Sequence, residues 1–141
     1  MPDLLLLKAG YHAPQKSKKW LIDTFFERIT CNELNDYLHY LNCDIFDTTY
    51  RQIGGERYYI FCDDGAFFAN EPIITAASKD SNDNWEPELA GNLIFAKLDM
   101  DKGETASLTE ADVINIMNNT QLFVKQDEAT PLVHAAVYLE D

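Results

Sequence analysis

The feature that most constrains the fold lies in the middle of the chain, where an apolar run is enclosed by two turn signals. The run is Arg57–Cys62, preceded by Gly54-Gly55 and followed by Asp63-Asp64-Gly65. Aromatic and β-branched residues favour strands, and a glycine pair between two such runs favours a tight hairpin turn. With the threonine-rich stretch Asp44–Tyr50 ahead of the turn, the pattern predicts an antiparallel sheet as the centre of the fold.

Strands are predicted on both sides of this hairpin. Short apolar runs bounded by turn residues are typical of strands, and they occur at Leu4–Lys8, Ala66–Phe68 and Leu93–Ala96. Near the end of the chain, the stretch at 122–124 fits a strand, whereas 132–139 fits either a strand or a short helix. The segment Lys79–Glu88 is rich in Ser, Asn and Asp, so we expect a loop there.

Three helices are predicted. Apolar residues recur at helical spacing between Ser17 and Ile29, which favours a first helix there. Asn32 is placed to cap a second helix that reaches Leu41, and Thr109 to cap a third with an acidic residue three positions later. The expected fold class is therefore α+β: one domain over residues 1–141, mostly antiparallel sheet, with two N-terminal helices and one late capped helix.

The charge of the chain is strongly acidic and unevenly distributed. Its 141 residues include 11 Lys and Arg against 24 Asp and Glu, a net charge of −13. Residues 1–28 hold five basic and three acidic residues, so the remainder holds six basic and 21 acidic residues and carries −15. This charge disfavours direct binding to nucleic acid or to anionic membrane surfaces. Because no apolar run is long enough for a secretory leader or a membrane span, we expect a cytoplasmic protein.

No motif predicts catalysis or a cofactor. Asp99, Asp101 and Glu110 fall at three positions of a calcium-binding loop, but Gly103 and Glu104 stand where a ligand and a glycine are required. The three histidines lack metal-ligand spacing, and the three cysteines lack a paired motif. We therefore expect no catalytic, cofactor-binding or metal-ligating residues, and a protein that is not an enzyme.

The acidic segments are instead candidates for binding a partner protein. A tryptophan inside an acidic loop could anchor such a contact, although packing against the edge of a sheet is an equally good interpretation of it. The candidate partner-binding residues are Asp63, Asp64, Asp80, Asp83, Trp85, Glu86, Glu88, Asp99, Asp101 and Glu104.

Two stretches resemble a family of short proteins of unknown function encoded by phages, plasmids and conjugative elements. The first joins the strand and acidic-Gly turn Tyr59–Gly65 to the proline segment Asn70–Ile73, and the second joins the Gly-containing strand Leu89–Phe95 to the helix start Ser107–Val113. The resemblance spans roughly residues 32–118 and brings no catalytic residues with it. It implies a mobile-element context.

Charge and resemblance together suggest two functions. The first is binding to the basic groove of a host nucleic-acid-handling enzyme, such as a restriction or CRISPR enzyme, as an anti-defence inhibitor or modulator that mimics nucleic acid. The alternative is a non-enzymatic accessory domain in phage or plasmid maintenance that binds a partner or itself. The same acidity would also serve solubility alone.

Overall fold

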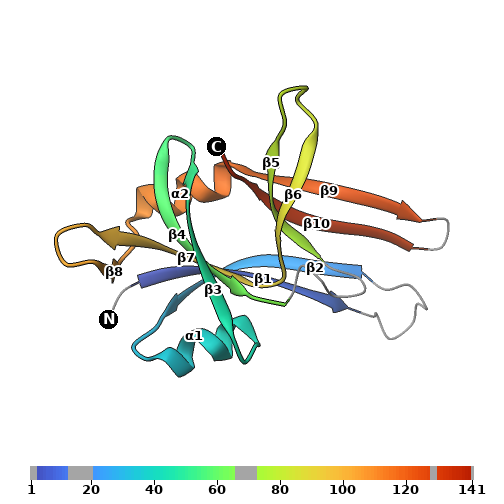
Figure 1. Ribbon diagram of the computed structural model, residues 1–141. Helices are drawn as coiled ribbons and strands as arrows, with labels where there is room; N and C mark the ends of the chain where they lie inside the picture. The colour runs from blue at the N-terminus through green and yellow to red at the C-terminus, as the bar shows by residue number, and fades with distance from the viewer. Residues whose placement is uncertain (1–2, 13–20, 66–72, 128–129, 141) are drawn as a thin grey trace.

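The computed structural model describes residues 3–12, 21–65, 73–127 and 130–140 (Figure 1). Most of these residues lie in strands, which form two sheets. The six-stranded sheet has the order β2-β1-β7-β4-β3, with β8 paired to β7, and all its neighbours are antiparallel. Its strands are β1 (Asp3–His12), β2 (Leu21–Thr30), β3 (Phe46–Ile53), β4 (Glu56–Asp63), β7 (Leu93–Asp99) and β8 (Glu104–Ala106).

The second sheet has four strands in the order β6-β5-β10-β9. Strands β5 and β10 are parallel, with Val137 opposite Ala76, while the other neighbours are antiparallel. The strands are β5 (Ile74–Lys79), β6 (Trp85–Ala90), β9 (Thr120–Asp127) and β10 (Thr130–Tyr138). Two helices, α1 (Leu34–Leu41) and α2 (Glu110–Asn118), complete the described part of the chain.

The six-stranded sheet is covered on both faces, which explains the four consecutive leucines of β1. Successive side chains of a strand point to opposite faces. Leu5 and Leu7 join the core that contains Ile116 of α2 and Val137 of the second sheet, whereas Leu4 and Leu6 join a separate core beside α1. Figure 1 shows α1 on one side of this sheet and the second sheet with α2 on the other. We call these sides the α1 face and the α2 face.

The expected α+β class with two N-terminal helices is wrong: the described chain is mostly β. The helix predicted from Ser17 to Ile29 is a strand over its described part, since residues 21–30 form β2 and pair with β1 along its whole length. Residues 17–20 lie outside the described residues. Phe25 and Ile29 lie on one face of β2 with Phe26 on the other, so the same residues satisfy the two-residue period of a strand. The leucines of β1 supply a buried neighbour for this strand, and that tertiary pairing overrides the helical spacing.

The other predicted helices are confirmed, with one shift. Helix α1 begins one residue later than expected, since its N-cap is Glu33 rather than Asn32. Helix α2 begins where predicted: the hydroxyl of Thr109 accepts from the backbone N–H of Asp112 at 3.2 Å, and the Asp112 carboxylate accepts from the N–H of Thr109 at 2.9 Å.

The remaining strand and turn predictions are confirmed in part. Gly54 and Gly55, at φ of +56° and +86°, make the turn between β3 and β4, and the two late stretches are both strands. The expected loop at Lys79–Glu88 is confirmed only for residues 80–84, which form the turn of a hairpin, and is wrong at its ends, because Lys79 belongs to β5 and residues 85–88 belong to β6. The predicted strand at 66–68 lies outside the described residues.

Candidate interaction site

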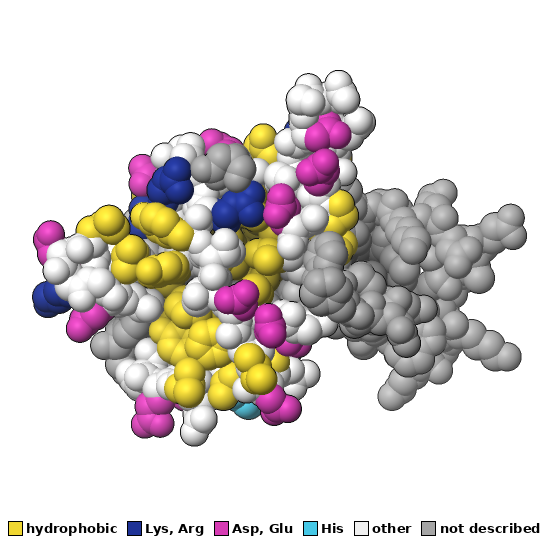
Figure 2. All heavy atoms as spheres, viewed as in Figure 1, with side chains coloured by type: hydrophobic (Ala, Val, Ile, Leu, Met, Phe, Trp, Pro, Cys, Tyr) yellow, Lys and Arg dark blue, Asp and Glu magenta, His cyan; other side chains and the backbone are white. Residues whose placement is uncertain are grey.

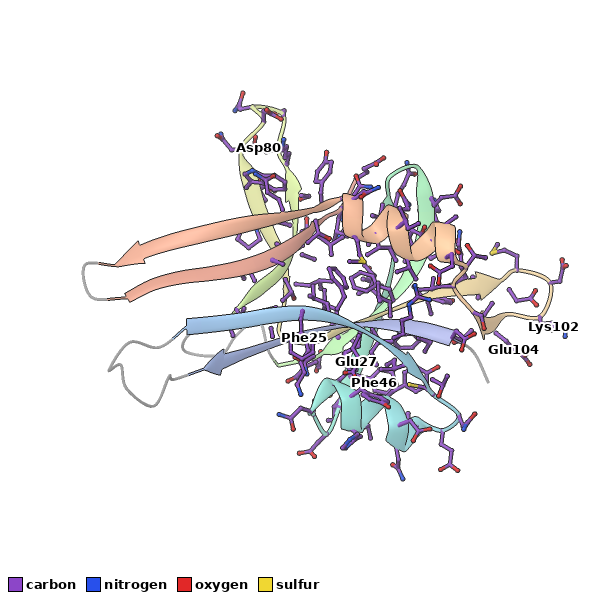
Figure 3. The ribbon with its side chains drawn as sticks, turned by 180° about the vertical axis from the view of Figure 1, so that it is seen from behind. Phe25, Glu27, Phe46, Asp80, Lys102 and Glu104 are labelled. Atoms are coloured by element: carbon purple, nitrogen blue, oxygen red, sulfur yellow. The ribbon has the colours of Figure 1, made fainter. Side chains whose placement is uncertain are left out.

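The ten predicted partner-binding residues lie in three separate places. Asp63 ends β4 and Asp64 follows it, the group from Asp80 to Glu88 lies on the β5–β6 hairpin, and the group from Asp99 to Glu104 lies at the β7–β8 turn. Because β4 and β7 are antiparallel, Asp63 and Asp99 lie at opposite ends of the sheet, about 20 Å apart at 3.3 Å per residue. Figure 3 shows Asp80 and Glu104 at two distant tips. The predicted residues therefore do not form one acidic patch.

Glu88 of β6 forms an ion pair with a residue of the six-stranded sheet. Its Oε1 accepts from the Ser78 hydroxyl at 2.7 Å, and its Oε2 lies 3.2 Å from Nη1 of Arg51 on β3. The carboxylate is half-buried between these partners. Both carboxylate oxygens of Glu88 have partners within the fold, so Glu88 is a poor candidate for contact with a partner protein.

Trp85, the first residue of β6, packs against another strand of its own sheet. Its ring meets the ring of Tyr138 edge-on at 5.5 Å, and Nζ of Lys79 lies 4.8 Å from the indole centroid. Trp85 is half-buried. The structure favours the packing interpretation over the exposed anchor.

Two of the predicted aspartates close their own turns. Oδ1 of Asp80 accepts from the backbone N–H groups of Asn82 and Asn84 at 2.8 and 2.9 Å, and these bonds, that from Asn84 first, lower the pKa of Asp80. Oδ1 of Asp99 accepts from the N–H of Asp101 at 3.0 Å. The Asp99–Glu104 segment is therefore the turn of a hairpin, as the glycine at 103 indicated.

The predicted pair Asp63 and Asp64 belongs to a denser group. Asp63 lies opposite Phe46 in the β3–β4 register, and the N–H of Asp64 donates to the carbonyl of Ile45 at 3.3 Å. This pairing brings Asp47 of β3, and Asp44 just before that strand, close to them. We call Asp44, Asp47, Asp63 and Asp64 the acidic end of the β3–β4 hairpin. Asp44 and Asp47 were not among the predicted partner-binding residues.

These carboxylates lie close enough to two cysteine thiols to affect the pKa values of both. Burial raises the pKa of Cys62 to about 11, and Asp47, Asp63 and Asp64 add to the increase. Burial, followed by Asp63 and Asp44, also raises the pKa of Cys43. Both groups are therefore protonated thiols at neutral pH, and neither is a ready nucleophile.

A row of aromatic rings runs from the acidic end along the α1 face. Tyr37 of α1 contacts Phe46 and Phe61 at 5.9 and 4.7 Å between centroids, Phe61 contacts Tyr59 at 6.2 Å, and Tyr59 contacts Tyr50 at 5.3 Å. Phe61 is buried, whereas Tyr50 is 38% exposed. Figure 2 shows apolar side chains gathered over β3 and next to α1 with acidic groups at their margins, and Figure 3 places Phe46 beside α1.

A different arrangement of acid and aromatic side chains lies on the α2 face. Asp112 is 8% exposed, and its carboxylate accepts from the hydroxyl of the fully buried Tyr58 at 3.0 Å, while Nζ of Lys97 lies 3.5 Å from it. Burial alone would raise the pKa of Asp112, but the hydrogen bonds from Thr109 and Tyr58 outweigh burial and lower it. This network joins α2 to the sheet and has a structural role.

A groove of about 540 Å³ lies beside the ends of β1 and β2 and the start of α2. Its lining includes Arg28 and Glu110, and Nη2 of Arg28 donates to Oε2 of Glu110 at 2.7 Å. Since the two charged groups neutralise each other, we assign no ligand to this groove.

Two further observations limit the kinds of site that the described residues hold. Within residues 3–12, 21–65, 73–127 and 130–140, no group of three or more His, Cys, Asp or Glu side chains is arranged to hold a metal ion. Neither helix in this part of the chain is long and apolar enough to cross a membrane.

Comparison of the chain with protein-family models, with curated proteins and with solved structures finds no match. The resemblance to proteins of mobile elements therefore stays a prediction, and the candidate site rests on its geometry alone.

Proposed function

We propose that the chain is a non-enzymatic cytoplasmic protein of a mobile element that binds the basic groove of a host nucleic-acid-handling enzyme and inhibits or modulates it. The observation that carries this proposal is the acidic end of the β3–β4 hairpin. It gathers four carboxylates, three of them on exposed residues, at one end of a partly exposed aromatic row. Acidic groups presented together on a rigid element can replace the phosphates that such a groove binds.

The charge of the whole chain supports the same function. A net charge of −13 attracts a basic surface over distances up to the Debye length, which is about 8 Å at physiological salt. Such attraction accelerates association, and the close contacts then determine orientation. Aromatic side chains beside the charges supply the apolar area that phosphates lack.

The test compares two variants with equal charge. In the first, Asp44, Asp47, Asp63 and Asp64 are replaced by Asn. In the matched control, four exposed residues of the two other hairpins are neutralised: Asp83→Asn, Glu86→Gln, Asp101→Asn and Glu104→Gln. Host enzymes recovered with the wild-type chain are purified, and their association rates are measured with and without DNA or RNA as competitor.

We expect the first variant to associate several-fold more slowly than the control, and nucleic acid to compete with the wild-type chain. Affinity should fall steeply as salt rises from about 50 to about 500 mM. Equal loss in both variants would indicate a non-specific effect of charge. Simultaneous binding of the chain and nucleic acid to one enzyme would contradict the proposal.

A further inference from the structure

Strand β3 is an edge strand, and its outward backbone groups can be identified. The N–H of Glu140 donates to the carbonyl of Gln52 at 2.8 Å from the side away from β4. Hydrogen-bonding direction alternates along an antiparallel strand, so Tyr50, Thr48 and Phe46 also direct their N–H and C=O groups outward. The N–H of Thr48 donates to the carboxylate of its neighbour Asp47 at 2.9 Å, which agrees with this assignment.

We propose that this edge binds an extended, cationic segment of a partner protein as an additional strand, next to β3 between Phe46 and Tyr50. The inference rests on the proposed function and specifies how the partner is recognised. An exposed row of backbone donors and acceptors is a template for a further strand, and strand addition is a common mode of peptide recognition. Glu140 already occupies the Gln52 end of this edge as a single antiparallel bridge.

The charges around the edge select a cationic segment. Residues opposite one another on neighbouring strands have Cβ atoms about 5 Å apart, so Lys or Arg on the added strand would reach Asp47 directly. Pairing with the added strand would release the Asp47 carboxylate from the Thr48 N–H and leave it available to the cation. Asp44, Asp63 and Asp64 lie at the same end of β3.

The aromatic row fits the other face of such a segment. The guanidinium of Arg57 lies 5.7 Å from the centroid of the Tyr50 ring, so this ring already faces one cation within the chain. An added strand would place every second side chain over Phe46 and Tyr50, which share the α1 face. Arginine, which both pairs with carboxylates and stacks on aromatic rings, suits both faces of the strand.

A second copy of the chain fits this edge poorly. Each copy carries −13, and pairing of β3 with itself would bring two acidic ends within the length of one strand. Like charges opposite each other on neighbouring strands are destabilising. The charge therefore favours a basic partner.

The experiment uses the full chain and a synthetic peptide of about ten residues with arginine at alternate positions and valine between them. Thr48→Pro removes the outward N–H without removing a bond of the β3–β4 ladder, and proline is tolerated on edge strands in this position. Thr48→Val retains the N–H and is the matched control. Melting temperatures verify the fold of both variants, and hydrogen exchange of the Tyr50 amide is measured in the wild-type chain.

We expect the peptide to slow exchange at the Tyr50 amide, to bind Thr48→Val like the wild-type chain, and to bind folded Thr48→Pro about tenfold more weakly or worse. Unchanged exchange at Tyr50, or no binding of the peptide to the wild-type chain, overturns strand addition. So does equal binding to folded Thr48→Pro. If that variant does not fold, the exchange result decides alone.

The failure of strand addition and the failure of the proposed function can be distinguished by experiment. If strand addition fails but the four-Asn variant of the acidic end still loses affinity for the enzyme, the proposed function stands without this mode of binding. If the four-Asn variant binds enzyme as the wild-type chain does, the acidic end has no part in binding, and the proposed function fails.

Discussion

Two acidic regions of the molecule differ in their surroundings. On the α2 face, the Asp112 carboxylate contacts the Thr109 N–H, the Tyr58 hydroxyl and Lys97. At the acidic end, by contrast, Asp44 and Asp64 are exposed. Both regions combine acidic side chains with aromatic residues of β4. They differ in the number of hydrogen-bond donors for each carboxylate. Both oxygens of Asp112 have donors, whereas the four carboxylates of the acidic end have more oxygens than the nearby donors can satisfy. A carboxylate with matched donors stabilises the fold, and one without them remains available to a partner.

The largest effect is expected for Asp112→Ala. The change removes three hydrogen bonds to a buried carboxylate, from the Thr109 N–H, the Thr109 hydroxyl and the Tyr58 hydroxyl, together with the ion pair to Lys97. We expect a loss of about 2–3 kcal/mol in the free energy of unfolding, measured by urea denaturation at pH 7.

The free energy of unfolding of the same variant should depend less on pH in the acidic range. Because the pKa of Asp112 is lowered in the folded chain, its contribution to stability is complete above the unfolded value of about 3.9 and disappears as the pH falls through the folded pKa. Stability should therefore fall less below pH 4 in Asp112→Ala than in the wild-type chain. Parallel curves would mean that Asp112 is not the titrating group.

Gly54→Ala tests how tightly the α2 face is closed. A Cβ at Gly54 would lie 2.1 Å from Oδ1 of Asn115 and 2.5 Å from Nδ2 of Asn119, and φ is +56°. We expect a loss of about 2 kcal/mol, from strain and from displacement of these amides. The neighbouring Gly55→Ala is the control, since its φ is +86° but nothing lies within 4 Å of the new Cβ. Equal losses in the two variants would show that only backbone strain matters.

Tyr58→Phe should cost less and should change the response to alkali. It removes one hydrogen bond to Asp112 and one from Asn115, so we expect a loss of about 1 kcal/mol at pH 7. Burial, with a smaller contribution from Asp112, raises the pKa of Tyr58 to about 12. Because the pKa of Tyr58 is higher in the folded than in the unfolded chain, the contribution of Tyr58 to stability is complete below about pH 10 and decreases as the pH rises towards 12. The variant should therefore lose less stability than the wild-type chain between these values, as followed by circular dichroism.

The sequence predicted elements where the local signal and the tertiary environment agree. The Gly54-Gly55 turn, the strand at Arg57–Cys62 and the cap at Thr109 all combine apolar periodicity with a specific turn or cap residue. It failed at residues 21–29, where Phe25, Phe26 and Ile29 satisfy both a helical and a strand period. Only the pairing with the leucines of β1 decides between them, and such a long-range partner is not visible in a local window.

The candidate site was predictable in part. Asp63 and Asp64 were chosen for their charge, but their neighbours on β3 could have been found by hairpin arithmetic. A two-residue turn at Gly54-Gly55 fixes the register, which places Phe46 opposite Asp63 and Asp47 opposite Cys62. By contrast, nothing local indicated that Glu88 would meet Arg51 or that Trp85 would meet Tyr138, because these contacts join elements far apart in the chain.

The smallest effect on stability is expected for the four-Asn variant of the acidic end, and it is the most direct test of the comparison. Asn retains a carbonyl oxygen that can accept from the N–H of Thr48 or Gly65, so the local turns should persist. Removing four like charges from exposed or half-buried positions relieves mutual repulsion. We expect the free energy of unfolding to change by no more than about 0.5 kcal/mol, measured by urea denaturation at low salt. A loss as large as that of Asp112→Ala would show that these carboxylates also maintain the fold, and the distinction between the two faces would no longer hold.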